Sequence, residues 1–181
     1  MATKNKTRYA ILGVLNLKPC SGYDIKKFCD KTISHFWNEN FGHIYPVLKQ
    51  LLEEGLITPH EQGVDERRKT YSITEKGKQE FAQWLLQPPE LQPPRSELLL
   101  KLSFGNHMPK EHALLIVEEV RLRNTNNLTQ YQVMEQAYCS DVNAKADPAF
   151  PYWLSSLRLG IINAEATLRW CEETLILLKG I

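Results

Sequence analysis

The chain has 181 residues, of which 43% are hydrophobic and 24% charged, and its formal net charge is +1. This length and composition predict a soluble globular protein of one or two domains with a real core. No apolar run reaches the length of a membrane span, and the N-terminal apolar segment is periodic without a clear cleavage site. We therefore expect a cytoplasmic protein that neither spans a membrane nor carries a signal peptide.

Catalytic and metal-binding motifs are missing from the sequence. The four cysteines are far apart and form no zinc-finger pair, and the five histidines show no metal-ligand spacing. No glycine-rich nucleotide loop and no nucleophile motif is present. We expect no cofactor, no metal site and no enzymatic activity.

The first elements in chain order are three helical segments. Apolar spacing predicts a helix over residues 9–17, and Ser21 is a plausible N-cap for a second helix that opens at Gly22. A third helix is predicted from Gly42 to about Glu54, followed by Gly55 in the position that ends a helix. Pro46 then lies near the first turn, where a missing N–H costs little.

A β-hairpin and a fourth helix follow. Residues 56–58 and 69–73 are predicted as strands on either side of a polar loop, and Thr74 is a natural N-cap for the next helix. The order helix, helix, helix, strand, strand, helix is typical of a winged helix-turn-helix domain. We assign this domain to residues 1–87 and a proline-rich linker to residues 88–95.

The second half, residues 96–181, is predicted to be helical. A short apolar helix lies within residues 95–104, a longer one runs from Pro109 to about Tyr138, and residues 140–151 are predicted as a loop. The last helix carries an apolar seam at spacings of three and four, whose partner is either the long middle helix of the same chain or a second subunit. The expected dimerisation residues are Leu154, Leu157, Ile161, Leu168, Leu175 and Leu178.

The predicted fold class is therefore mainly α. It consists of an N-terminal winged helix-turn-helix with a two-stranded wing and a C-terminal helical, coiled-coil-like dimerisation domain.

At this point the sequence resembles the PadR family of bacterial transcriptional regulators. The segments that carry the resemblance are YAILGVL, SGYDIKK, FWNENFGHIYPVLKQLLEEGLI, RRKTYSITEKGKQEFAQWL and SELLLKLSF. The C-terminal half is similar to the longer members, which share it with the virulence activator AphA. The resemblance implies a homodimeric winged-helix protein that binds a two-fold operator in double-stranded DNA. It also implies a repressor, in the usual case, that a small aromatic or hydrophobic effector releases from DNA.

Three groups of residues are candidates for DNA contact. The first turns of the second motif helix would enter the major groove, the start of the preceding helix could bind phosphate, and the basic wing tip could reach phosphates or the minor groove. An ordinary exposed residue, or plain capping beside a core tyrosine, is the alternative at these positions. The candidates are Ser21, Tyr23, Lys26, Asn40, His43, Tyr45, Lys49, Arg67, Arg68 and Lys69.

Three tryptophans are candidates for an effector pocket between the two halves: Trp37, Trp84 and Trp153. A core role is the alternative for each of them. The alternative for the whole chain is a winged-helix module that binds protein rather than DNA.

Overall fold

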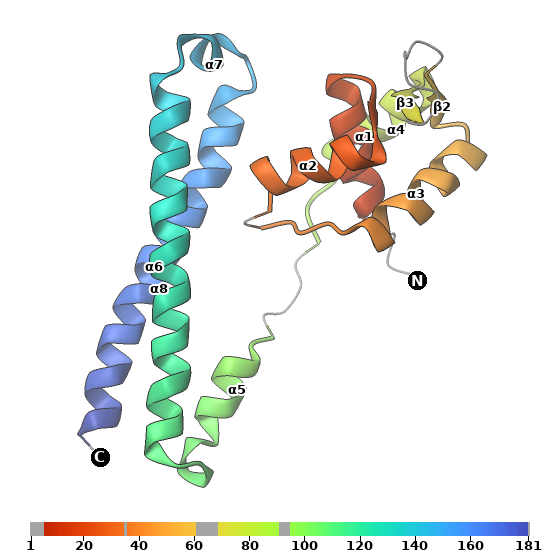
Figure 1. The fold of residues 1–181 in the computed structure, drawn as a ribbon. Helices are drawn as coiled ribbons and strands as arrows, with labels where there is room; N and C mark the ends of the chain where they lie inside the picture. The colour runs from red at the N-terminus through yellow and green to blue at the C-terminus, as the bar shows by residue number, and fades with distance from the viewer. Residues whose placement is uncertain (1–5, 35, 61–68, 91–94, 181) are drawn as a thin grey trace. The chain divides into compact units, whose positions relative to one another are not determined.

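The computed structural model describes residues 6–34, 36–60, 69–90 and 95–180. The chain divides into two compact units, Met1–Leu91 and Gln92–Ile181 (Figure 1). The first unit contains α1 (Thr7–Leu17), β1 (Cys20–Ser21), α2 (Gly22–Thr32), α3 (Phe41–Glu53), β2 (Ile57–Pro59), β3 (Thr70–Ile73) and α4 (Glu75–Leu85). The second contains α5 (Glu97–Ser103), the 3-10 turn η1 (Gly105–His107), α6 (Lys110–Ser140), α7 (Val142–Ala146) and α8 (Phe150–Lys179).

A single apolar core holds the first unit together. The inner faces of α1, α2 and α3 supply most of it, and the largest fully buried side chains include Ile11, Leu12, Ile25, Leu48 and Leu51. Phe81 and Trp84 of α4 pack against its edge. The amphipathic spacing read from the sequence therefore does place one face of each helix inside.

Side-chain caps define where α2, α3 and α4 begin. The Ser21 side chain accepts a hydrogen bond from the Asp24 backbone N–H while the Asp24 carboxylate accepts one from the Ser21 N–H, a complete capping box. Asn40 caps α3 through the His43 N–H, and Thr74 caps α4 through the Gly77 N–H. The predicted caps at Ser21 and Thr74 are confirmed.

Hydrogen bonds and close packing join the start of α4 to the turn after α3. Gly55 has a φ of +69°, the left-handed conformation that suits glycine, and the chain reverses there into β2. The Thr74 hydroxyl lies 2.9 Å from the Gly55 carbonyl and 3.0 Å from that of Leu56. A Cβ on Gly77 would lie 2.1 Å from the Leu56 carbonyl oxygen, so this position requires glycine.

The sheet has one more strand than the two-stranded wing predicted from the sequence. β2 and β3 form the expected antiparallel hairpin, with Ile57 opposite Ile73. β1 adds to the free edge of β3, with Cys20 opposite Tyr71, so the strand order is β1-β3-β2. This strand ties the connection between α1 and α2 to the base of the wing.

The second unit is a long antiparallel helix pair. Figure 1 shows α6 and α8 side by side, with α7 across one end, and these two helices form the main packing contact of the unit. Val117 of α6 and Cys171 and Leu175 of α8 are buried in it. The predicted loop over residues 140–151 is wrong in part, because α7 forms within it and Pro151 already lies in the first turn of α8.

The apolar seam of α8 faces its own chain. Leu157, Ala164, Cys171 and Leu175 are buried within the unit, while Leu154, Ile161, Leu168 and Leu178 are partly buried. The buried part of this seam therefore packs within the chain, where α6 is the main partner of α8. Leu157, at 1% exposed, has almost no surface left for a second subunit.

No helix in the described ranges is both long and apolar enough to cross a membrane.

Candidate nucleic-acid interface

The first turns of α2 and α3 meet on the surface through three exposed aromatic rings. Tyr23 stacks on Phe41 with ring centroids 6.3 Å apart, and Phe41 stacks on Tyr45 with centroids 6.0 Å apart. All three rings remain more than two-fifths exposed. We call Tyr23, Phe41 and Tyr45 the aromatic ladder. Phe41 is not among the contacts predicted from the sequence, although its spacing of four residues from Tyr45 places both on one helix face.

Gly22 makes room for the ladder. A Cβ at this position would lie 2.8 Å from Cε1 of Tyr45 and 3.2 Å from the side chain of Leu48. Because glycine has no Cβ, the Tyr45 ring can lie across the start of α2.

Helix α3 presents a polar face beside the ladder. His43, Tyr45 and Lys49 are exposed, and the Lys49 side chain, at 79% exposed, forms a long ion pair of 3.9 Å with Glu53. The opposite face is buried through Ile44, Val47, Leu48 and Leu51, which confirms the predicted core positions. A helix held by one face with its first turns exposed has the geometry of a groove-reading helix.

Asn40 is first of all a helix cap. Its Oδ1 accepts a hydrogen bond of 3.0 Å from the His43 N–H, and its Nδ2 lies 3.5 Å from Nε2 of His43. This cap was not predicted from the sequence, whose pattern placed the start of the helix at Gly42 rather than Phe41. A bidentate contact with adenine would have to share the capping oxygen.

The phosphate anchor predicted at the start of α2 is only partly supported by the geometry. Ser21 is 4% exposed, and its hydroxyl is engaged by the Asp24 carboxylate. The negative charge of that carboxylate already lies at the N-terminus of α2, where the helix dipole is positive. Its presence weakens the attraction of this site for a second anion such as phosphate. Lys26 forms an ion pair with Asp30, and Tyr23 is exposed rather than a core residue.

A buried carboxylate supports the start of α3. Glu39 is 2% exposed, and its oxygens accept hydrogen bonds from Thr7 Oγ1 at 3.2 Å and Trp37 Nε1 at 2.5 Å. Nδ1 of His43 lies 3.8 Å from the same carboxylate. Trp37, predicted as an effector contact, donates its indole N–H to Glu39 in this structure. No sequence pattern marked Glu39, because Thr7 lies 32 residues away.

Arg8 forms an ion pair at the other end of α3. It is 8% exposed and forms ion pairs with Glu54, at the end of α3, and with Glu80 of α4. Although burial works against it, the hydrogen bond to Glu54 and the two carboxylates raise the pKa of Arg8. The same hydrogen bond from Arg8 lowers the pKa of Glu54.

The tip of the wing lies largely outside the described residues. Arg67 and Arg68 belong to that tip, while Lys69 is described and exposed just before β3. At the base of the wing, the Ser72 hydroxyl and Nδ1 of His60 are 2.8 Å apart, and the His60 N–H donates to the Thr70 carbonyl.

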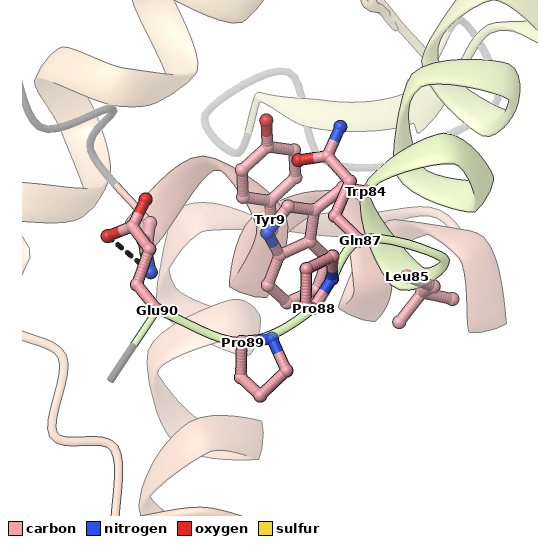
Figure 2. Close-up of a pocket in the computed structure, with 8 residues that line it drawn as sticks. Tyr9, Trp84, Leu85, Gln87, Pro88, Pro89 and Glu90 are labelled. Atoms are coloured by element: carbon pink, nitrogen blue, oxygen red, sulfur yellow. Dashed lines mark ion pairs between the residues drawn. The ribbon is translucent and has the colours of Figure 1, made fainter. Parts of the chain in front are cut away.

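A cavity of about 360 Å³ lies in the first unit, between the start of α1 and the end of α4. Figure 2 shows the Tyr9 ring against the Trp84 ring; their centroids are 4.4 Å apart and the planes nearly parallel. The linker residues Pro88, Pro89 and Glu90 line the same cavity, and Glu90 forms an ion pair with Lys6 at 3.0 Å. Trp84 thus lines a cavity, whereas Trp37 and Trp153 are not among its lining residues. Within the described part of the chain, no group of side chains could hold a metal ion.

Comparison with known proteins identifies both units. Residues 11–83 match the transcriptional regulator PadR-like family, and residues 94–179 match the virulence activator alpha C-terminal family. The negative transcriptional regulator PadR of Bacillus subtilis is 37% identical over 109 residues, which cover 59% of this chain and 60% of that protein.

Solved structures match nearly the whole chain. The crystal structure of Bacillus subtilis PadR in complex with operator DNA has a TM-score of 0.80 and 29% identity, covering 96% of this chain and 99% of that one. The structure of the same protein with p-coumaric acid has a TM-score of 0.78 and 27% identity, covering 97% and 99%. These comparisons confirm the predicted fold class, and they match regulators rather than enzymes. The chain belongs to the PadR-like family of transcriptional regulators, with a PadR-like domain followed by a virulence-activator C-terminal region.

Proposed function

We propose that the chain binds a two-fold operator in double-stranded DNA as a homodimer, with the first turns of α3 in the major groove, and represses transcription there. The observation that carries this proposal is the exposed face of α3, where His43, Tyr45 and Lys49 stand opposite a fully buried face. The operator complex of the Bacillus subtilis relative supports the proposed DNA binding. That relative is a negative transcriptional regulator, which supports repression rather than activation.

Within this interface, we assign different contacts to different residues. Lys49 and Tyr45 contact bases or phosphates from α3, with His43 beside them, and Tyr23 and Lys26 approach the backbone from α2. Arg67, Arg68 and Lys69 reach the phosphates or minor groove from the wing. Ser21 and Asn40 act through the helix caps that orient these side chains.

A gel-shift titration tests the proposal on an operator selected from random DNA by the wild-type protein. We expect Lys49→Ala to weaken binding about tenfold or more, and Arg67→Ala/Arg68→Ala to weaken it and flatten its salt dependence. Lys145→Ala, an exposed lysine of α7 in the other unit, is the matched control. Failure to enrich any sequence, or an unchanged affinity and salt slope in both variants, would contradict the proposed interface.

We propose that dimerisation uses the second unit. Large apolar side chains stay exposed on its helices although the seam of α8 is already buried, and a second copy would cover them. They include Leu100 and Phe104 near α5, Leu122 of α6, and Ile162, Ile176 and Leu177 of α8.

We propose that a small aromatic effector occupies the cavity beside Tyr9 and Trp84. The stacked rings offer a flat apolar wall, and the cavity volume suits a molecule of one or two rings. The p-coumaric acid complex of the Bacillus subtilis relative supports this class of ligand. Titration with p-coumaric acid should change the tryptophan fluorescence saturably in the wild type and not in Trp84→Phe. The absence of a saturable change in the wild type would argue against a phenolic effector.

A further inference from the structure

We propose that Phe41 is a specificity-determining residue whose ring contacts the C5-methyl group of a thymine in each operator half-site. This inference rests on the proposed DNA interface and adds to it a contact that reads one base. Three features of the structure carry it: the position of Phe41, the support of its ring, and the chemistry of its exposed edge.

Phe41 is the first residue of α3, directly after the Asn40 cap. In a helix-turn-helix domain, the residues at this end of the second helix contact the base edges. Its side chain is 42% exposed and is not part of the apolar core of the unit. Packing of the core therefore does not explain why a phenylalanine stands here.

The ring is nevertheless held in place. It stacks between Tyr23 of α2 and Tyr45 of α3, with planes inclined by 12° and 21°. The Tyr45 ring in turn lies where Gly22 leaves space for it, and two capping interactions fix the starts of both helices. An apolar contact group that is already ordered loses little side-chain entropy on binding, which favours a specific contact.

The chemistry of the ring selects its partner. Phenylalanine has no hydrogen-bond donor or acceptor, so it cannot read the polar pattern of the major groove. The apolar feature on a base edge in that groove is the methyl group of thymine, which apolar side chains including phenylalanine contact. Polar discrimination is left to His43 and Lys49, two exposed polar residues of the same helix.

Replacement of thymine by deoxyuridine tests the contact without changing the protein, because this substitution removes only the methyl group. The operator selected from random DNA is scanned one symmetric thymine pair at a time, and binding is measured by gel shift. For the wild type we expect one pair whose replacement weakens binding about fourfold per half-site, the value of one buried methyl group. Other thymine pairs should change the affinity less than twofold.

Protein variants then assign the effect to Phe41. Phe41→Ala should bind the thymine and deoxyuridine operators equally, whereas Phe41→Leu should keep part of the preference. Gly22→Ala, which displaces Tyr45, should reduce the preference although Phe41 is unchanged. Leu17→Ala, an exposed apolar residue at the end of α1, is the control and should keep the full preference.

Each outcome decides between the proposals. If the wild type binds its operator but no deoxyuridine replacement weakens binding, or if Phe41→Ala keeps the same preference, the thymine contact is wrong and the proposed function stands. If the wild type selects no DNA sequence at all, both proposals fail.

Discussion

Two buried charged residues, one at each end, hold the candidate recognition helix. Glu39 accepts hydrogen bonds from Thr7 and Trp37 just before α3, and Arg8 binds Glu54 at its end. A buried charge is costly unless it is paired, so each of these groups depends on its partners. Since Thr7 and Arg8 are neighbours in α1, that helix orients α3 from both ends.

The Arg8–Glu54 contact predicts a pH dependence of stability. Arg8 lowers the pKa of Glu54 in the folded state, so the stabilisation is complete above the unfolded pKa of about 4.3 and is lost as the pH falls below it. We expect Glu54→Gln to lower the free energy of unfolding at pH 7 and to flatten its decline below pH 5, measured by urea titration. Glu53→Gln, the exposed neighbour, is the control, and parallel pH profiles for wild type and Glu54→Gln would contradict the prediction.

The four cysteines predict one fast-reacting thiol. Burial raises the pKa of Cys20 and Cys29 to about 11 and also raises the pKa of Cys171, whereas Cys139 is partly exposed. Because the thiolate is the reactive form, we expect one rapid equivalent with a thiol reagent at pH 7.5, and none in Cys139→Ser. A rapid equivalent that persists in Cys139→Ser would show that one of the buried sites opens readily.

At the scale of elements, the helix α3 depends on its cap. Removal of the Asn40 side chain in Asn40→Ala should lower the free energy of unfolding by about 1 kcal/mol, because the His43 N–H loses its acceptor. In Asn40→Ser the serine hydroxyl can still accept the hydrogen bond from the His43 N–H, but the amide N–H that a contact with adenine needs is gone. This variant therefore separates the capping role of Asn40 from a base contact. We expect Asn40→Ser to keep both the stability and, within threefold, the operator affinity. A large loss of affinity at unchanged stability would instead assign Asn40 a base contact.

The elements that could be predicted from the sequence are those with enough residues to show a period. The four helices of the first unit and the long helix α8 carry one, and α6 carries a weaker, interrupted one. The β2–β3 hairpin was predicted from strand-forming residues on either side of a polar loop. β1 has two residues, and its partner residues in β3 lie 49 and 51 positions later; α7 has five residues. Neither element therefore leaves a periodic signal. In α6 the Asn124 side-chain amide donates to the Val120 carbonyl one turn earlier, so this polar residue is accommodated within the helix.

The part of the candidate site that lies on α3 was predictable from the helix period. His43, Tyr45 and Lys49 follow from the helix period, because the buried positions of α3 fix the exposed ones. Glu39 and the Tyr23–Phe41 contact join segments that are distant in sequence, and no local pattern contains them.

At the scale of the whole molecule, the seam of α8 shows why an apolar stripe does not identify the helix that packs against it. A stripe with a period of three and four residues is equally compatible with a helix of the same chain and with one of a second subunit. In the folded chain Leu157 and Leu175 are buried with α6 and α8 packed together, while Ile176 and Leu177 are 73% and 71% exposed. The dimer surface that we propose therefore lies beside the buried part of the seam, at exposed positions such as Ile176 and Leu177.

Two variants separate the intrachain seam from the dimer surface. Leu157→Ala should lower the free energy of unfolding by about 2–5 kcal/mol through the cavity it leaves, with the subunit contact surface unchanged. Ile176→Glu/Leu177→Glu changes only exposed positions, so each subunit should keep its helical content. In sedimentation equilibrium this variant should dissociate at least tenfold more readily than the wild type, because association would bury two carboxylates per subunit. Two results together would contradict this prediction: Ile176→Glu/Leu177→Glu still forms the wild-type dimer, and Leu157→Ala is a monomer with native stability. They would show that the seam itself is the dimer contact.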